Sequence, residues 1–297
     1  MTRPKTLHRL PVAGGDYTVA EWSGRGPTLL AIHGITASHM AWPSVIQHLP
    51  GEPRILAPDL RGRGANSELP GPYGFPTHVD DLRATLDFFG EERVVLVGHS
   101  LGAYIALAFA ERFPMRVRGI VLVDGGLARP RPPGLTPEQT IKAVLGPALA
   151  RLDMRFESIE AYRAFWQAHP AFQDPGAWNP EVQDYIDYDL VGEAPQLRSR
   201  VRAEPVMADA YALMEPDMVT LVDRVAAPML LLTAPRGLLN QPEPLLPEAV
   251  VADKVAHLPQ LKHEEIGDTN HYTIVTGDGR ARTAAAIDHF ISTRCPV

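Results

Sequence analysis

The sequence predicts an α/β fold in which a mostly parallel β-sheet carries helices on both faces. Short apolar runs rich in β-branched residues occur at 28–33, 54–59, 94–99, 117–124 and 229–233, and helix-like segments separate most of them. Their hydrophobicity is continuous rather than alternating, which is typical of strands that are covered on both sides. The alternation of strands and helices indicates a mostly parallel sheet with helices packed on each face.

Three more strands and five helices complete the predicted core. Residues 6–12 and 16–22, joined by Ala13-Gly14-Gly15, are expected to form a hairpin at the edge of the sheet. A short strand is expected at 262–266. In one predicted helix, apolar residues from Val79 to Phe89 recur at helical spacing and form a single stripe. The helices are predicted at 38–49, 77–89, 101–112, 246–257 and 280–293.

The middle of the chain departs from this pattern. Between Gly125 and about Ala227 we find no convincing buried strand. A proline-rich stretch at 127–134 predicts a stiff loop, and amphipathic segments rich in aromatic residues follow it. A helical insertion of this kind suggests a lid over the sheet, and an ordinary helical subdomain with a small core of its own is compatible with the same pattern. We therefore predict a core domain of residues 1–125 and 228–297 and a helical cap at 126–227.

The composition argues against several classes of function. The 297 residues are 45% hydrophobic and 21% charged, which provides a large core and argues against a disordered chain. The formal net charge of -7 disfavours nucleic acid as a partner, because an acidic protein repels the phosphate backbone. The single cysteine, Cys295, can form neither an internal disulfide nor a thiolate metal site.

The apolar segments contain no membrane signal. The first ten residues carry positive charge without the apolar stretch of a signal peptide, and the longest apolar runs, such as 104–110, are too short to span a bilayer. We therefore expect a soluble, cytoplasmic protein with no membrane span. The oligomeric state stays open at this stage.

The motif that carries chemistry is Gly98-His99-Ser100-Leu101-Gly102, which directly follows one predicted strand and precedes one predicted helix. A serine on a sharp strand-to-helix turn is held in strained backbone geometry with its hydroxyl pointing out of the sheet, and the flanking glycines leave room for the turn. The helix N-terminus behind it supplies free N–H groups that favour a developing oxyanion. We therefore predict that Ser100 is a nucleophile.

This elbow, the order of the strands and the His33-Gly34 pair after an early strand resemble the α/β-hydrolase superfamily. The resemblance extends from about Leu10 to Phe290. It implies an eight-stranded, mostly parallel sheet with a helical cap inserted after the sixth strand. It also implies that the main-chain amides of Ile35 and Leu101 form an oxyanion hole.

Two residues near these motifs are expected to be structural, and a third is expected to take no part in the site. His33 is expected to hold the oxyanion loop through side-chain hydrogen bonds. Asp59 lies in a loop that also resembles the family, and it is expected to order a turn. His99 is expected to face away from the site within its strand.

The predicted nucleophile needs a base to take its proton. Histidine suits this role because its ordinary pKa is about 6.5. The chain has 11 histidines, and in the resembled family the base comes last, on a loop after the final strand. His271 lies in such a loop, between the strand expected at 262–266 and the last helix. We therefore predict that His271 is the general base.

The acid that completes the triad has several candidates. In most members of the family it follows the strand predicted here at 229–233, but that loop contains no aspartate, and Asn240 stands roughly where one is expected. Asp124, at the end of the preceding strand, lies beside the nucleophile strand and can meet the need for a buried carboxylate. We predict Asp124, with Glu243 or the amide oxygen of Asn240 as alternatives.

Together these residues predict a serine hydrolase that cleaves a carboxylic ester or a related acyl compound through an acyl-enzyme. Hydrolysis of lactones or amides, hydrolytic C–C cleavage and acyl transfer use the same groups and stay open. Serine rather than aspartate at position 100 argues against epoxide hydrolysis and dehalogenation.

The alternative from another class is a non-catalytic small-molecule-binding protein on the same fold. The missing aspartate near Asn240 is the feature that favours it. The chain contains no zinc-helix, phosphate-loop or dinucleotide motif, so we expect no metal and no cofactor. The predicted partner is a small-molecule acyl substrate.

Overall fold

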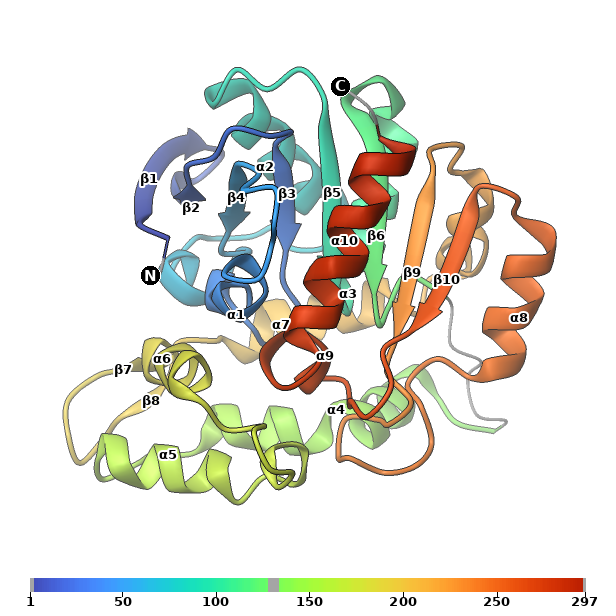
Figure 1. Cartoon of the computed structure of the whole chain (residues 1–297). Coiled ribbons are helices and arrows are strands. Elements are labelled where there is room, and N and C mark those ends of the chain that lie inside the picture. The colour runs from blue at the N-terminus through green and yellow to red at the C-terminus, as the bar shows by residue number, and fades with distance from the viewer. Residues whose placement is uncertain (1–2, 128–133, 296–297) are drawn as a thin grey trace.

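The computed structural model describes residues 3–127 and 134–295, so most of the predicted proline-rich stretch lies outside the described residues. Among the described residues, the larger of the two sheets has eight strands in the order β1-β2-β4-β3-β5-β6-β9-β10 (Figure 1). The β1–β2 and β2–β4 pairs are antiparallel and the other pairs of this sheet are parallel, as predicted. The strands are β1 (Lys5–Val12), β2 (Gly15–Trp22), β3 (Leu29–Ile32), β4 (Ile55–Pro58), β5 (Val94–His99), β6 (Val117–Val123), β9 (Met229–Thr233) and β10 (Leu261–Glu265).

Helices cover both faces of the sheet because strand side chains alternate between two apolar cores. In β3, Leu30 and Ile32 belong to one core, whereas Leu29 and Ala31 belong to the other. The first core includes side chains of α2 (Phe75–Phe88), α3 (Leu101–Arg112) and α8 (Glu248–His257). The second includes side chains of α1 (Pro43–Ile46), α9 (Thr273–Thr276) and α10 (Arg280–Arg294).

The boundaries of α2, α3, α8 and α10 agree with the prediction to within two residues. The prediction of one long helix at 38–49 is wrong, because this segment is a 3₁₀ turn, His39–Ala41, followed by the short α1. Pro43 has no N–H to continue the turn, and the Asp59 carboxylate accepts the His39 N–H at 2.7 Å. Among the described helices, none is both long and apolar enough to cross a membrane.

The chain between β6 and β9 forms the predicted helical insertion, and its helices α4, α5 and α6 lie below the sheet in Figure 1. We call its described residues, 134–227, the insertion. A small hairpin of two-residue strands precedes α7, and it was not predicted because two residues are too few to show a periodic pattern. The elements are α4 (Pro137–Asp153), α5 (Ile159–Gln167), α6 (Pro180–Tyr188), β7 (Leu190–Val191), β8 (Arg198–Ser199) and α7 (Ala203–Ala212).

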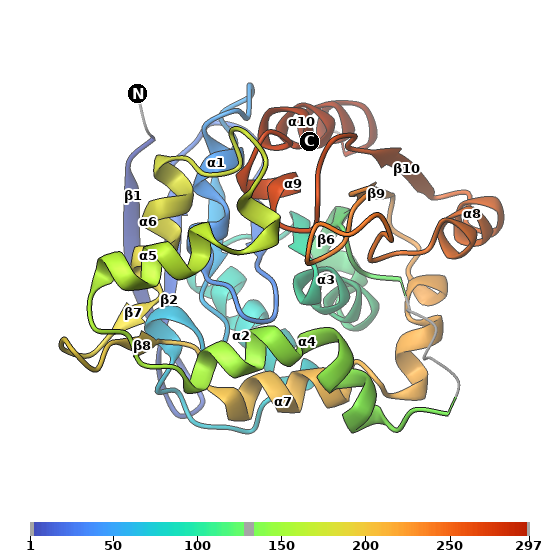
Figure 2. The same cartoon turned by 90° about the horizontal axis from the view of Figure 1, so that it is seen from below.

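The two halves of the insertion pack differently. Helices α5 and α6 have an aromatic core of their own, which includes Tyr162, Trp166 and Phe172. Helices α4 and α7 lie side by side (Figure 2), and residues such as Ile141 and Val206 belong to the core that contains α2 and α3. One half of the insertion is therefore a subdomain with its own core, and the other half extends the main core.

Candidate active site

Ser100 lies on a sharp turn between β5 and α3. Its φ of 55° and ψ of −120° form a conformation that is strained for a residue with a side chain, and its N–H donates to the Val123 carbonyl at 3.0 Å. A Cβ at Gly98 would lie 2.3 Å from the Gly102 carbonyl oxygen, and a Cβ at Gly102 would lie 2.1 Å from that of Ile32. Only glycine allows these approaches, so the turn presents the partly exposed serine at the start of α3.

His271 and Asp124 form a buried hydrogen-bonded pair. The Nδ1–H of His271 donates to Oδ2 of Asp124 over 2.6 Å, and the two side chains are 4% and 0% exposed. The other oxygen, Oδ1, accepts the main-chain N–H of Ala234 at 3.2 Å. A carboxylate bound to Nδ1 leaves Nε2 as the ring nitrogen that can accept a proton.

Ser100 lies beside this pair. Strands β5 and β6 are parallel neighbours, so Ser100 and Asp124 leave the sheet at the same edge. A Cβ at Gly125 would lie 2.9 Å from Cα of Ser100, which shows how closely the two turns approach. His271 comes from the loop between β10 and α9, and its ring centroid lies 4.7 Å from that of His99. The structure therefore brings the three predicted residues together.

The expectation that His99 faces away from the site is wrong. Its Nε2–H donates to the main-chain carbonyl of His271 at 2.9 Å, and the two rings are tilted by 32°. Burial lowers the pKa of His99 well below its ordinary value, and the nearby His271 lowers it further, so His99 is neutral at neutral pH. The sequence missed this contact because nothing in it shows that the His271 loop crosses the end of β5.

The loop after β3 contacts the serine turn, and His33 holds this loop in place. A Cβ at Gly34 would lie 3.3 Å from Cβ of Ser100. The Nδ1–H of His33 donates to the Gly34 carbonyl at 2.8 Å, and its Nε2 accepts the Leu60 N–H at 2.9 Å. Burial lowers the pKa of His33 to about 4, so the ring stays neutral. The structural role predicted for His33 is confirmed, and Ile35 follows directly on the glycine that touches the serine.

Asp59 orders the turn after β4, as predicted. Its Oδ1 accepts the Nδ1–H of His39 at 2.9 Å as well as the main-chain N–H, and its Oδ2 accepts the Ala65 N–H at 2.8 Å. The Tyr188 hydroxyl of α6 also donates to Oδ2 at 2.7 Å, which links the insertion to the core. Burial alone raises the pKa of Asp59, but the charge and hydrogen bonds of His39, together with His33, lower it more, so this pKa lies well below its ordinary value.

The alternative acids have other environments. Asn240 uses its Oδ1 to accept an N–H of Asn270 at 3.0 Å, and the Glu243 side chain is exposed. Of the three candidate positions, Asp124 is the one whose side chain is hydrogen-bonded to His271 in the described structure.

Asn270 holds the His271 loop and was missed at the sequence level. Its Oδ1 accepts the main-chain N–H groups of Tyr272 and Thr273 at 2.9 and 3.0 Å. Its Nδ2 donates to the Ala171 carbonyl of the insertion at 2.9 Å. An asparagine ahead of a helix is a capping signal that the sequence does contain, but its bond to the insertion has no local signal.

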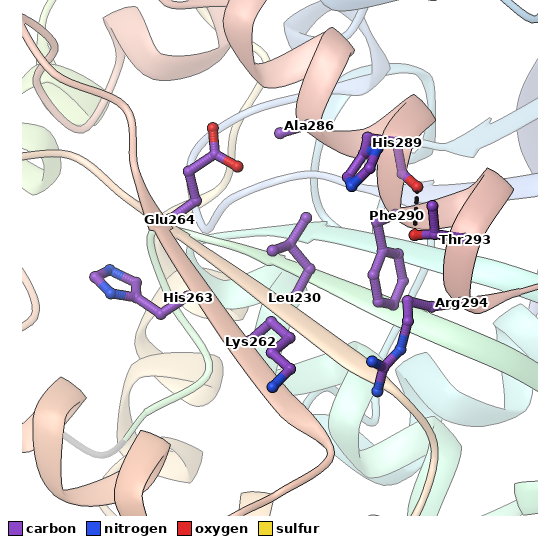
Figure 3. Close-up of a pocket in the computed structure, with 9 residues that line it drawn as sticks. All are labelled: Leu230, Lys262, His263, Glu264, Ala286, His289, Phe290, Thr293 and Arg294. Carbon is purple, nitrogen blue, oxygen red and sulfur yellow. Dashed lines mark hydrogen bonds between the residues drawn. The ribbon is translucent and has the colours of Figure 1, made fainter.

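Other places for a ligand lie away from these residues. A pocket of about 370 Å³ opens between β10 and α10 (Figure 3). Lys262, Glu264 and Arg294 line it, and the candidate site residues are not among its lining residues. Among the residues that the structure describes, no group of three or more His, Cys, Asp or Glu side chains is arranged to hold a metal ion.

The groups gathered at Ser100 are those that nucleophilic acyl transfer requires. They are a hydroxyl on a strained turn, an imidazole with a carboxylate on Nδ1, and the main-chain N–H groups at the N-terminus of α3. The close approach of Gly34 to Cβ of Ser100 places the loop after β3 next to the serine side chain.

Comparison with known proteins identifies the family to which the fold belongs. Residues 27–278 match a family model described as the alpha/beta hydrolase fold. A 2-hydroxy-6-oxo-2,4-heptadienoate hydrolase of Pseudomonas putida is 29% identical over 217 residues, which cover 71% of this chain and 68% of that protein. Lipase LipV of Mycobacterium tuberculosis is 39% identical over 114 residues, which cover 38% of this chain and 43% of the lipase.

A solved structure is similar over nearly the whole length. The crystal structure of E-2-(acetamidomethylene)succinate hydrolase superposes with a TM-score of 0.79, covering 98% of this chain and 100% of that one at 23% identity. At this identity the likeness concerns the fold. These named relatives are hydrolases with different substrates.

Proposed function

This chain belongs to the alpha/beta hydrolase fold family, and from that premise we propose that it is a serine hydrolase of carboxylic esters or related acyl compounds. In this proposal Ser100 is the nucleophile, His271 the general base and Asp124 the acid. The substrate is a small-molecule acyl compound.

The observation that carries the proposal is the buried bond of 2.6 Å between His271 Nδ1 and Asp124 Oδ2, beside a serine held at φ 55°. Buried His–Asp pairs also occur at His39–Asp59 and His78–Asp209, so the pair alone does not mark a catalytic site. A structural turn serine needs no strained backbone, and the His271–Asp124 pair is the one that lies beside such a serine. Strain and buried polar pairs are unfavourable in isolation, so their combination at one sheet edge supports a catalytic purpose.

In the first step the Ser100 oxygen attacks the carbonyl carbon while Nε2 of His271 takes the hydroxyl proton. Asp124 holds the imidazole in the tautomer that has a free Nε2 and stabilises the imidazolium that forms. The tetrahedral intermediate then expels the alcohol, which receives its proton from His271, and the acyl group remains on the serine.

The negative oxygen of the intermediate lies, in this proposal, between the main-chain N–H groups of Ile35 and Leu101. Leu101 is the first residue of α3, where the N–H groups have no helical partner. Each such donor is worth about 3 kcal/mol of transition-state stabilisation in comparable enzymes.

In the second step a water molecule attacks the acyl-serine. His271 takes a proton from the water and returns it to the Ser100 oxygen as the acyl–oxygen bond breaks, so the acid leaves and the free serine is restored. Serine forms an ester intermediate that water can hydrolyse at the carbonyl, and this supports acyl substrates over epoxides and alkyl halides, which require a carboxylate nucleophile.

We assign residues 1–125 and 228–297 to the catalytic core and residues 126–227 to a cap. Support comes from the separate aromatic core of α5 and α6 and from the position of the insertion between β6 and β9. The residues assigned to catalysis all belong to the core part.

The proposal is tested with short-chain p-nitrophenyl esters and a fluorophosphonate probe. We expect wild-type turnover, an intact-mass increase of one adduct and localisation of that adduct to Ser100. The Ser100→Ala variant is the control and should lose both turnover and the adduct. A wild-type protein that neither turns over nor reacts would favour a non-catalytic binding protein instead.

A further inference from the structure

A buried arginine connects the loop after β3 to the insertion. Arg63 lies in the turn after β4, and its side chain is 0% exposed. Its Nε–H donates to the Ile35 carbonyl at 2.9 Å, and its Nη1–H donates to the Arg61 carbonyl at 2.8 Å. Its remaining nitrogen, Nη2, lies 2.7 Å from Oδ2 of Asp209 on α7. One side chain thus contacts the core loop and the insertion at the same time.

Asp209 is buried between two side chains of the core. Besides Arg63, it contacts His78 of α2, whose Nε2 lies 3.0 Å from Oδ1 and 3.1 Å from Oδ2. Burial alone raises the pKa of Asp209, but Arg63 and His78 lower it more, so this pKa lies below its ordinary value. The carboxylate is therefore an anion at neutral pH.

The direction of the Ile35 N–H depends on two peptide groups. The N–H shares a planar peptide group with the Gly34 carbonyl, which accepts the hydrogen bond from His33. The Ile35 carbonyl belongs to the next peptide group and accepts the Arg63 Nε–H. Because the two planes meet at one Cα, these two hydrogen bonds together determine where the amide points.

Arg63 can hold the Ile35 carbonyl only while its own charge is balanced. A guanidinium stays protonated in proteins, and removing its partner leaves an uncompensated buried charge. Burial lowers the pKa of Arg63, and Asp209 opposes that effect. Without the carboxylate, the guanidinium would turn toward water or other dipoles and release the loop.

We propose that Asp209 is a positioning residue that acts through Arg63 and keeps the Ile35 amide aimed at the oxyanion. Helix α7 of the insertion then takes part in catalysis as well as covering the core. The inference rests on the proposed function, because it concerns an amide that binds an oxyanion there. Loss of a direct oxyanion donor slows acyl transfer about 10²–10³-fold, so an indirect effect is expected to be about 10- to 100-fold.

Asp209→Asn tests the proposal because it keeps the shape of the side chain and removes its charge. Asp189→Asn is the matched control, since Asp189 is also an insertion carboxylate paired with a buried arginine, Arg151, at 2.5 Å. We expect Asp209→Asn to lower kcat about 10- to 100-fold with KM changed less than about threefold, and Asp189→Asn to leave kcat within about threefold. A trifluoromethyl ketone, which forms an oxyanion on Ser100, should lose affinity for Asp209→Asn by the same factor as kcat/KM.

Two further variants keep the test independent of folding. Arg63→Lys retains a cation for Asp209 but lacks the planar fork that reaches Ile35, so kcat should fall as in Asp209→Asn. His78→Gln disturbs the other partner of Asp209 and leaves the Arg63 contact, so kcat should stay within about threefold. Equal losses in all four variants would overturn the inference, because they would indicate a general loss of stability.

Hydrogen exchange gives a readout that needs no activity. Main-chain amides at 33–36 should exchange faster in Asp209→Asn than in wild type and at an unchanged rate in Asp189→Asn. Equal exchange in the two variants overturns the inference. A wild-type protein without turnover or labelling overturns the proposed function and the catalytic part of this inference, and faster exchange in Asp209→Asn would then show that the contact acts on the loop alone.

Discussion

The sheet edge that carries Ser100 and the insertion that lies beside it are stabilised differently. The sheet edge depends on close backbone approach, such as that of Gly102 to β3, and on main-chain hydrogen bonds such as that of Ser100 to Val123. In the insertion, α5 and α6 depend on an aromatic core of their own, whereas α4 and α7 pack into the main core. Buried polar contacts such as that of Asp209 with Arg63 also join the insertion to the core domain. The proposed reacting groups thus come from the core alone.

The insertion reaches these groups through the loops that carry them. Tyr272, next to His271, packs against Trp166 with ring centroids 6.3 Å apart. Several polar contacts join the regions, and among them are those of Asp209 with Arg63, Tyr188 with Asp59, and Asn270 with the Ala171 carbonyl. Substitutions of the proposed reacting groups in the core should therefore abolish activity. Substitutions in the insertion should instead change the rate or unfold one half of the insertion locally.

The largest effect is expected on the core side. Asp124→Asn removes the carboxylate that pairs with His271, and comparable triads lose about 10⁴-fold in kcat on this change. We expect kcat on a short p-nitrophenyl ester to fall about 10³- to 10⁴-fold with little change in KM. Glu243→Gln and Asn240→Ala are the controls and should each lower kcat less than about tenfold. An unchanged rate for Asp124→Asn would indicate that the acid of the triad is a residue of the loop after β9.

The next effect separates the two halves of the insertion. Phe172→Ala removes a buried ring from the aromatic core, which should lower local stability by about 3–5 kcal/mol. Hydrogen exchange should accelerate in α5 and α6 and stay unchanged in β5, because the cores are separate. Ile141→Ala on α4 should instead lower the midpoint of global unfolding, since this side chain belongs to the main core. If both variants lower the midpoint of global unfolding to the same extent, the two halves of the insertion do not have separate cores.

Low pH should decrease the free energy of unfolding of the core, because His33 is buried there as a neutral ring. The unfolded histidine has a pKa of 6.5 and the folded one a pKa of about 4, so between these values the unfolded chain binds more protons. Stability is therefore fully present above about pH 6.5 and falls by about 3 kcal/mol as the pH approaches 4, at about 1.4 kcal/mol per unit.

Urea unfolding at about pH 7 and about pH 4.5 measures this effect. His257→Asn is the control, because it removes a histidine whose side chain is exposed. A free energy of unfolding that stays constant over this range would contradict the neutral, buried state of His33.

The smallest effect concerns His99. His99→Phe keeps a ring beside His271 but leaves the His271 carbonyl without its donor. An unpaired buried carbonyl is unfavourable by about 1–3 kcal/mol, so we expect the His271 loop to shift and relieve it. A resulting loss of about 1.4 kcal/mol of transition-state stabilisation would lower kcat about tenfold. His99→Gln, which keeps an N–H donor, should recover part of the rate. If the pH profile of kcat/KM shifts in His99→Phe and not in His99→Gln, His99 acts by positioning His271. A lower rate with an unshifted profile would indicate a general loss of stability.

Much of the core could be predicted because its signals are local. Continuous apolar runs identified the buried strands, and the spacing of Gly98 and Gly102 around Ser100 identified the turn. The predicted helix at 38–49 was too long because the Asp59 carboxylate, which takes the His39 N–H, is far away in the sequence. The hairpin of β7 and β8 escaped prediction because its strands are two residues each.

The sequence by itself determined the eight strands, the position of the insertion and Ser100 as a candidate, because periodicity and spacing are visible without folding. The choice of His271 also needed the chain order of the family that the sequence resembles. The tertiary structure alone decided which carboxylate pairs with His271, that His99 supports the His271 carbonyl and that Asp209 balances Arg63. Each of these pairs joins distant segments in a buried place. Their physical cause is the strength of electrostatic interactions at low dielectric, and that environment exists only after the chain has folded.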